Sequence, residues 1–139
     1  MKWIRIGTFI MLAVVVVLLA GCAWMQTSAK TPLEKAKVNA KIFNDWFDDT
    51  YAQCKQSYDT GGPKVREFIA KEVDPRLMKA QDVIHLYTQA VHDWEETVKK
   101  NPASGEFTPD SIMDIKLQVD SLMLETNQML LNWKTTGGK

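Results

Sequence analysis

The chain of 139 residues has few of the side chains that most often carry chemistry, with only two cysteines and two histidines. Its 17 basic and 17 acidic residues cancel, so it lacks the positive surplus that a general nucleic-acid binder normally needs. The same balance excludes a disordered tail of one charge sign. No segment shows the apolar-polar alternation of a half-buried strand. We therefore expect one all-α domain at this length and no nucleic-acid partner.

The two histidines are too far apart to bind one metal ion together. His85 and His92 are separated by seven positions, so in a helix they share a face but lie about 10.5 Å apart along the axis. A zinc ion needs its ligands about 2 Å away. His92 and Glu96 are neighbours on such a helix, but two surface ligands do not make a site. We expect no metal and no cofactor.

The acidic and glycine motifs do not predict catalysis either. Asp45, Asp48 and Asp49 are helix neighbours, but paired carboxylates act as acid and base only when burial or a partner separates their pKa values. No Gly-x-Ser-x-Gly elbow occurs, and Gly61-Gly62 is not followed by the Gly-Lys-Ser of a phosphate-binding loop. We therefore expect a solvated acidic face and no enzyme activity.

A long apolar run occurs only near the N-terminus. Lys2 and Arg5 give a short positive start, and an uncharged stretch rich in valine and leucine extends from Ile6 to Ala20. Small residues then precede Cys22. A positive start, an apolar centre and a small-residue end are the three parts of a secretory signal. The pattern predicts export, with the rest of the chain outside the cytoplasm.

The end of this segment, Leu18-Leu19-Ala20-Gly21-Cys22, closely resembles the lipobox of bacterial lipoprotein precursors. In that class the cysteine thiol receives a diacylglyceryl group, the signal is cut off just before it, and the new amino terminus is usually acylated. The resemblance implies that residues 1–21 are a cleaved signal peptide and that Cys22 is the lipidated first residue. Two or three acyl chains hold a protein stably on a membrane, whereas one is marginal.

The resemblance also bears on localisation. In that class, aspartate after the modified cysteine tends to keep the protein in the inner membrane, and here the position is Ala23. The expected place is therefore the periplasmic face of the outer membrane, if the host has one. An uncleaved transmembrane anchor stays open as the alternative, because Ile6 to Met25 is an uncharged run of 20 residues. About 20 apolar residues are enough to cross a bilayer.

Beyond a short polar tether at residues 22–31, three segments of about 25 residues each carry apolar or tolerant side chains at alternating steps of three and four. The stripes are Leu33, Ala36, Ala40, Phe43, Phe47, Thr50 and Cys54; then Leu77, Ala80, Ile84, Tyr87, Val91, Trp94 and Val98; then Ile112, Ile115, Val119, Leu122, Thr126, Met129 and Trp133. This repeat predicts an antiparallel three-helix bundle over residues 32–134 with coiled-coil-like heptads. Residues 135–139 are expected to form a flexible tail.

Local signals predict where these helices begin and end. Thr31 and Glu34 have the spacing of a capping box, with a proline in the first helical position. Gly61-Gly62 is expected to end the first helix through left-handed and irregular backbone. Pro75 interrupts the middle segment, where proline removes a hydrogen bond and clashes with the preceding turn. We expect the middle helix to be kinked or split near Pro75.

Two groups of side chains on the stripes leave alternatives open. If Cys22 carries lipid, Cys54 has no partner within the chain, and its stripe position predicts burial; a disulfide-linked dimer is the other interpretation. Trp46, Trp94 and Trp133 lie at or beside stripe positions, one in each segment. They are expected to pack in the core, with a groove for a small apolar ligand as the alternative.

The last segment has a second apolar line, formed by Met113, Leu117, Leu124 and Leu131. At 100° per residue this line is nearly opposite the stripe from Ile112 to Trp133, although an edge helix needs only one apolar face. We expect the line to contact a protein partner or a second copy, unless the middle segment wraps around and covers it. The predicted function is a non-catalytic envelope lipoprotein with an interaction or structural role. A periplasmic ligand-binding module is the alternative.

Overall fold

The computed structural model describes residues 31–136. The predicted signal peptide, Cys22 and the tether before Thr31 lie outside the described residues, as does the end of the predicted tail. Within residues 31–136 the chain is all-helical, without strands, and three long helices are in contact. None of the helices described there is long and apolar enough to cross a membrane.

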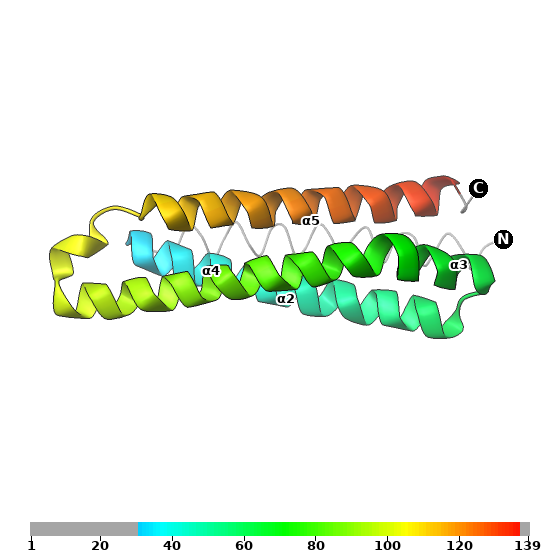
Figure 1. The fold of residues 1–139 in the computed structure, drawn as a ribbon, viewed down its shortest axis with the longest axis horizontal. Coiled ribbons are helices and arrows are strands. Elements are labelled where there is room, and N and C mark those ends of the chain that lie inside the picture. Colours follow the sequence, from blue (N-terminus) through cyan, green and yellow to red (C-terminus); the bar gives the residue numbers. More distant parts are fainter. Residues whose placement is uncertain (1–30, 137–139) are drawn as a thin grey trace.

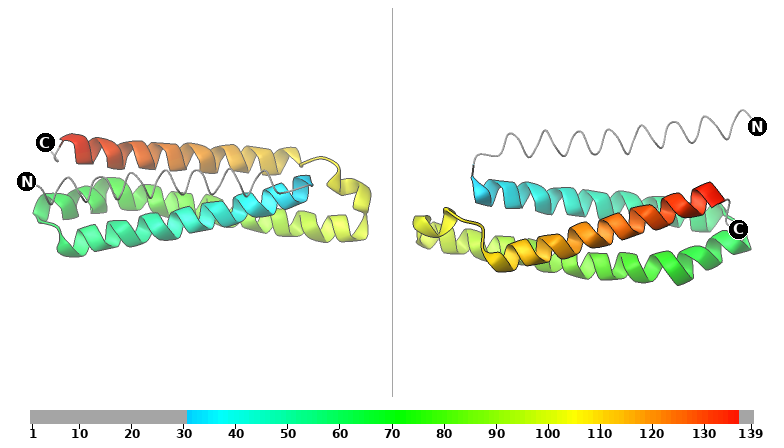
Figure 2. Two further views of the ribbon diagram at one scale, coloured as in Figure 1. Left: turned by 180° about the vertical axis from the view of Figure 1, so that it is seen from behind. Right: turned by 90° about the horizontal axis from the view of Figure 1, so that it is seen from above.

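Three long helices and three short elements follow one another along the chain. In order they are α2 (Pro32–Thr60), α3 (Pro63–Phe68), the π-helical turn η1 (Ile69–Val73), α4 (Asp74–Lys100), the 3₁₀ turn η2 (Pro102–Gly105) and α5 (Asp110–Thr136). The chain reverses direction between α2 and α3 and again between α4 and α5 (Figure 1). Views from behind and from above show the long helices lying along one common axis (Figure 2).

The central helix is α4, which packs extensively against both α2 and α5, while α2 and α5 contact each other much less. This arrangement follows from the sequence of α4, whose buried residues recur along most of its length. They are Leu77, Ala80, Val83, Ile84, Tyr87, Val91 and Trp94. The outer helices α2 and α5 each use one apolar face to cover α4.

The first helix begins as its sequence predicts. The backbone N–H of Glu34 donates to Oγ1 of Thr31 at 3.1 Å, and the backbone N–H of Thr31 donates to Oε2 of Glu34 at 2.9 Å. Pro32 occupies the first helical turn, where its missing N–H costs no hydrogen bond. The predicted capping box is therefore confirmed.

Gly61 and Gly62 do end α2, but the expected left-handed backbone is wrong. Gly61 has φ −82° and ψ 162°, and Gly62 has φ −75° and ψ 177°, which is extended backbone open to any residue. Gly61 is needed for space instead: a Cβ atom there would lie 2.4 Å from the carbonyl oxygen of Ser57 and 2.7 Å from Cγ1 of Val65. A Cβ atom on Gly62 would meet nothing within 4 Å.

The kink or split expected at Pro75 is not confirmed, because the irregular turn lies just before that residue. In η1 the backbone N–H of Asp74 donates to the carbonyl of Ile69, five residues back, and Val73 keeps helical angles of −87° and −52°. Pro75 therefore falls in the first turn of α4, where a missing donor is tolerated. A π turn at this point adjusts the register ahead of the proline. The carbonyl of Glu72 accepts a hydrogen bond from Nη1 of Arg76 at 2.6 Å.

The core consists of two clusters of buried side chains. The larger one fills the half of the bundle nearer the α4–α5 connection, and the smaller one lies beneath η1. The larger cluster contains Ala36, Ala40, Phe43, Ala80, Val83, Ile84, Tyr87, Val91, Trp94, Ile112, Val119 and Leu122. The smaller cluster contains Cys54, Ile69, Val73 and Leu77. The bundle is thus packed more extensively at the end where η2 and α5 begin.

Candidate functional site on the outer face of α5

One face of α5 belongs to the core. Ile112, Val119 and Leu122 are 2%, 0% and 7% exposed, and all three belong to the larger cluster. Thr126 on the same face is completely buried, and its hydroxyl donates to the carbonyl of Leu122 at 2.7 Å. That internal hydrogen bond allows a polar side chain to sit in an apolar environment. This face therefore attaches α5 to the rest of the bundle.

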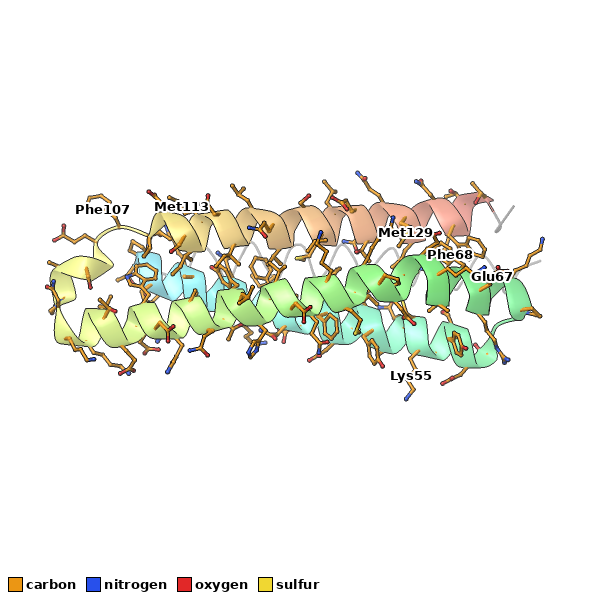
Figure 3. All side chains as sticks on the ribbon, viewed as in Figure 1. Lys55, Glu67, Phe68, Phe107, Met113 and Met129 are labelled. Atoms are coloured by element: carbon orange, nitrogen blue, oxygen red, sulfur yellow. The ribbon has the colours of Figure 1, made fainter. Side chains whose placement is uncertain are left out.

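The opposite face of α5 carries the four side chains of the second apolar line. Met113, Leu117, Leu124 and Leu131 are 44%, 65%, 58% and 54% exposed. At 100° per residue they fall within about 40° of one another around the helix axis. Figure 3 shows Met113 near the start of α5, on the side away from α4. We call these four residues the outer line.

Nothing in the described part of the chain buries the outer line. The alternative raised by the sequence was that the middle segment wraps around this face, but α4 packs against the opposite face of α5. Polar neighbours of the line satisfy one another within the helix. Lys116 pairs with Asp120 at 2.5 Å, and Ser121 donates to Glu125 at 3.1 Å. The leucines between them are left open to solvent.

The three tryptophans do not come together. Trp94 is 5% exposed, and its Nε1 donates to the carbonyl of Ser104 at 2.9 Å, at one end of the bundle. Trp46 is half-buried and donates to Oδ1 of Asn127 at 3.2 Å. Trp133 stacks on Phe68 near the other end, with ring centroids 4.0 Å apart and planes 4° from parallel. A shared groove between these three indoles is therefore not formed.

An open cleft of about 440 Å³ lies beside Trp133, between α5 and the segment from α3 to the start of α4. Figure 3 shows Phe68 and Met129 at this end of the molecule. The residues around the cleft are Phe68, Glu72, Arg76, Glu125, Gln128, Met129, Asn132, Trp133 and Thr136. Arg76 and Glu72 pair at 3.3 Å along one edge. The cleft offers an aromatic wall with a polar rim.

Cys54 is buried, as its stripe position predicts, at 5% exposure in the smaller core cluster. Burial raises the pKa of its thiol, and the nearby carboxylate of Asp74 raises it further, while Lys134 acts in the opposite direction. A raised pKa keeps the thiol protonated and slow to react at neutral pH. A disulfide-linked dimer would require this part of the bundle to open.

The remaining titratable candidates lie on the surface. His85 and His92 are exposed, as are Asp45, Asp48 and Asp49 of α2, and Asp45 pairs with Lys41 on the same helix. Within residues 31–136 no three histidine, cysteine or acidic side chains gather closely enough to hold a metal ion. These residues form a solvated surface in the structure.

The most exposed large apolar residue of the described chain was missed by pattern reasoning. Phe107 is 80% exposed, whereas Leu117, the next most exposed, is 65% exposed. It lies outside the three stripes, in the connection between α4 and α5. The available signal was a lone aromatic residue in a stretch otherwise rich in proline, glycine and small polar residues.

No protein family, curated protein or solved structure matches this chain. The outer line of α5 is therefore the feature of the chain itself that points most directly to a function.

Proposed function

We propose that the chain is the precursor of a small bacterial envelope lipoprotein whose helical domain acts without catalysis, by presenting the outer line of α5 to a protein partner. In this proposal residues 1–21 are removed and Cys22 carries the lipid anchor. Ala23 after the cysteine supports a position on the periplasmic face of the outer membrane, where the host has one. The covalent lipid is the only non-protein group that the proposal includes.

The exposure of the outer line is the observation that supports an interaction role. Four large apolar side chains, each 44% to 65% exposed, follow one edge of α5 for about 27 Å. Single exposed leucines are common on soluble proteins, but an aligned set of this kind marks an interaction surface. Leu117, Leu124 and Leu131 recur every seven residues, the spacing used when a helix lies in a groove or against another helix.

The charges of α5 favour a different protein over a second copy. The helix contains four acidic side chains and two basic ones, so two such helices would repel each other. A partner with basic residues beside its apolar contact would be complementary. Self-association through the outer line would therefore need other contacts to offset this repulsion.

The proposal extends to the scaffold that carries the outer line. We infer an antiparallel bundle of α2, α4 and α5 with coiled-coil-like heptads. The reversals of chain direction at Gly61-Gly62 and in the α4–α5 connection support it (Figure 1). The spacing of the buried residues in α4 supports it as well.

A paired substitution on the outer line tests the interaction role. Leu117→Asp together with Leu124→Asp should abolish chemical crosslinking to the partner in the envelope, with little change in the urea midpoint of unfolding. Leu86→Asp is the matched control, because Leu86 on α4 is 58% exposed, like Leu124. The control should keep the crosslink. Retained crosslinking together with a large fall in the midpoint would show that the line is core instead.

A second candidate function rests on the cleft beside Trp133. An aromatic wall with a polar rim is a reasonable receptor for a small apolar or aromatic ligand in the periplasm. Titrating such ligands should change the tryptophan fluorescence of the wild type but not that of Trp133→Phe. Fluorescence that never responds would remove this candidate.

A further inference from the structure

The connection between α4 and α5 is built as a fixed loop. The indole N–H of Trp94 donates to the carbonyl of Ser104 at 2.9 Å, which fastens η2 to the last turns of α4. Ser104 also donates twice to the carbonyl of Asn101, from its backbone at 3.0 Å and from its hydroxyl at 2.6 Å. A Cβ atom on Gly105 would lie 3.1 Å from Cγ1 of Val98, so the loop packs closely on α4.

This fixed loop holds one aromatic side chain away from the protein. Phe107 follows η2 by two positions and is 80% exposed, although Ser104 and Gly105 just before it are half-buried. Figure 3 shows Phe107 at the end of the bundle where α4 gives way to α5. Ser104 and Gly105 anchor the loop on α4, so the ring of Phe107 is displayed from a fixed position and is available to bind an apolar surface.

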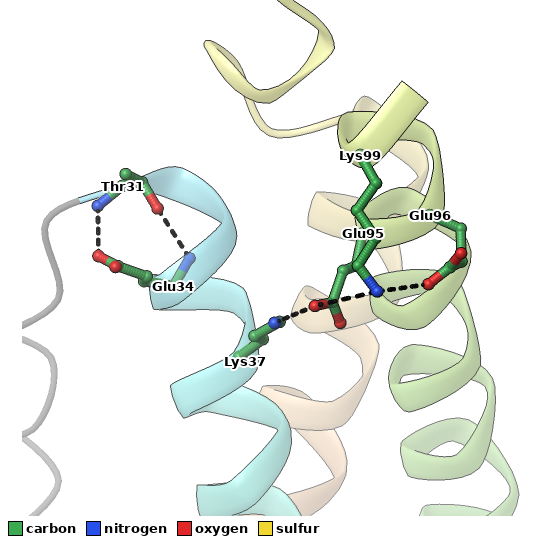
Figure 4. A network of polar contacts seen from close by, with 6 residues as sticks. All are labelled: Thr31, Glu34, Lys37, Glu95, Glu96 and Lys99. Atoms are coloured by element: carbon green, nitrogen blue, oxygen red, sulfur yellow. Dashed lines mark hydrogen bonds and ion pairs between the residues drawn. The ribbon is translucent and has the colours of Figure 1, made fainter. Parts of the chain in front are cut away.

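The described chain begins at the same end of the bundle. The start of α2 lies beside the α4–α5 connection (Figure 1). An ion pair joins it to α4 (Figure 4): Nζ of Lys37 lies 2.6 Å from Oε1 of Glu95, which also lies 3.8 Å from Nζ of Lys99 on α4. The capping box at Thr31, where α2 begins, lies about two turns before Lys37. The entry point and the Phe107 loop therefore share one end of the molecule.

The length of chain between Cys22 and Thr31 brings this end close to the membrane. This step rests on the proposed function, in which Cys22 carries the lipid anchor. Eight residues lie between Cys22 and Thr31, so nine residue-to-residue steps join them. A fully extended chain of this length reaches about 30 Å. The bundle end that displays Phe107 is thus held near the lipid surface at a high effective concentration, where a weak contact is sufficient.

We propose that Phe107 inserts into the boundary between lipid headgroups and acyl chains, and that the bundle docks on the bilayer through this end. Phenylalanine is a typical apolar residue of such interfacial contacts. Lys37 and Lys99 at this end are paired with Glu95 and Glu96, so we expect an apolar contact that is not driven by anionic lipid. Docked in this way, the long axis points away from the membrane and the outer line of α5 stays accessible to a partner.

Depth measurements on the full chain test this docking. The protein is expressed with its own N-terminus and reconstituted in vesicles of phosphatidylethanolamine, with and without phosphatidylglycerol. A spin label is placed at Ala103→Cys in η2 or at Gln118→Cys in the middle of α5, both exposed positions. Unsubstituted protein reports the background, because Cys54 is buried. The depth of each label is measured with and without the substitution Phe107→Ser. Leu86→Ser is the matched control, because it also removes an exposed apolar side chain.

The expected result is a label at position 103 that reports the lipid interface, equally in both vesicles, and moves into water in Phe107→Ser. The label at position 118 should stay in water throughout, and Leu86→Ser should change neither reading. A label at 103 that is in water in the unsubstituted loop overturns the docking. Intact mass on the same samples separates the two proposals, because an unmodified chain that does not bind vesicles would overturn the lipid anchor and the docking together.

Discussion

The two faces of α5 contain similar side chains in opposite surroundings. Leu122 is 7% exposed and packs against α4, whereas Leu124, two residues later, is 58% exposed and contacts no other helix face closely enough to be covered. Core packing explains the first face completely. The second face has more apolar surface than the domain needs for its own fold, which is why we assign it to an interaction.

Truncating one leucine on each face should give the largest contrast. Leu122→Ala removes buried methyl groups and should lower the free energy of unfolding by about 2–5 kcal/mol. Leu124→Ala should change it by less than about 0.5 kcal/mol, because its side chain is already in water. Urea denaturation of both variants measures this difference. Equal losses of unfolding free energy in the two variants would contradict this difference between the faces, since both leucines would then belong to the core.

The two glycines after α2 offer a similar contrast at a bend. Gly61→Ala should cost about 1–3 kcal/mol, because the new methyl group collides with the backbone of Ser57 and the side chain of Val65. Gly62→Ala should be tolerated, since that position faces open space. Thermal unfolding of both variants measures the effect. A harmless Gly61→Ala would mean that α2 and α3 can separate at no cost.

A smaller effect is expected from the one polar side chain in the middle of the buried face. Thr126→Val exchanges a hydroxyl for a methyl group, and the donor and its desolvation cost disappear together. The free energy of unfolding should change by less than about 1 kcal/mol. A loss above this range, seen in urea denaturation, would mean that the hydroxyl has a further role in the packing of α5 on α4.

The smallest effect concerns Cys54 and appears only at high pH. Because burial raises the pKa of this thiol in the folded state, its contribution to stability is fully present below the ordinary thiol pKa. The contribution is lost as pH rises through the higher pKa of the folded state.

Burial of Cys54 also has a consequence at neutral pH. Alkylation of the thiol in native protein should be slow and should speed up on unfolding. Fast alkylation of the native protein at neutral pH would contradict the burial of Cys54.

Local signals predicted much of the fold because they act over a few residues. The capping box at Thr31 and the buried stripe of α4 both depend on neighbours within one or two turns. The conformation of Gly61 could not be predicted in this way, because it depends on how closely Val65 approaches. The π turn before Pro75 was not predicted either; two of its residues, Ile69 and Val73, are buried in the smaller core cluster.

The candidate site was predictable only in part. The angular spacing of Leu117, Leu124 and Leu131 predicts one shared face, and the structure places that face in solvent. The sequence contains no signal for the occupant of this face, because the contacting residues belong to another molecule. Phe107 was missed because a lone aromatic residue has no period, and its meaning depends on which end of the bundle the chain enters.

The most direct test of the account is site-specific photocrosslinking in living cells. A photoreactive residue at position 117 or 124 should yield an adduct with a different protein, and one at position 86 on α4 should yield none. Positions 86 and 124 are equally exposed, so exposure alone cannot produce this difference. Absence of adducts at both α5 positions, or adducts only between two copies of this chain, would contradict the proposed partner.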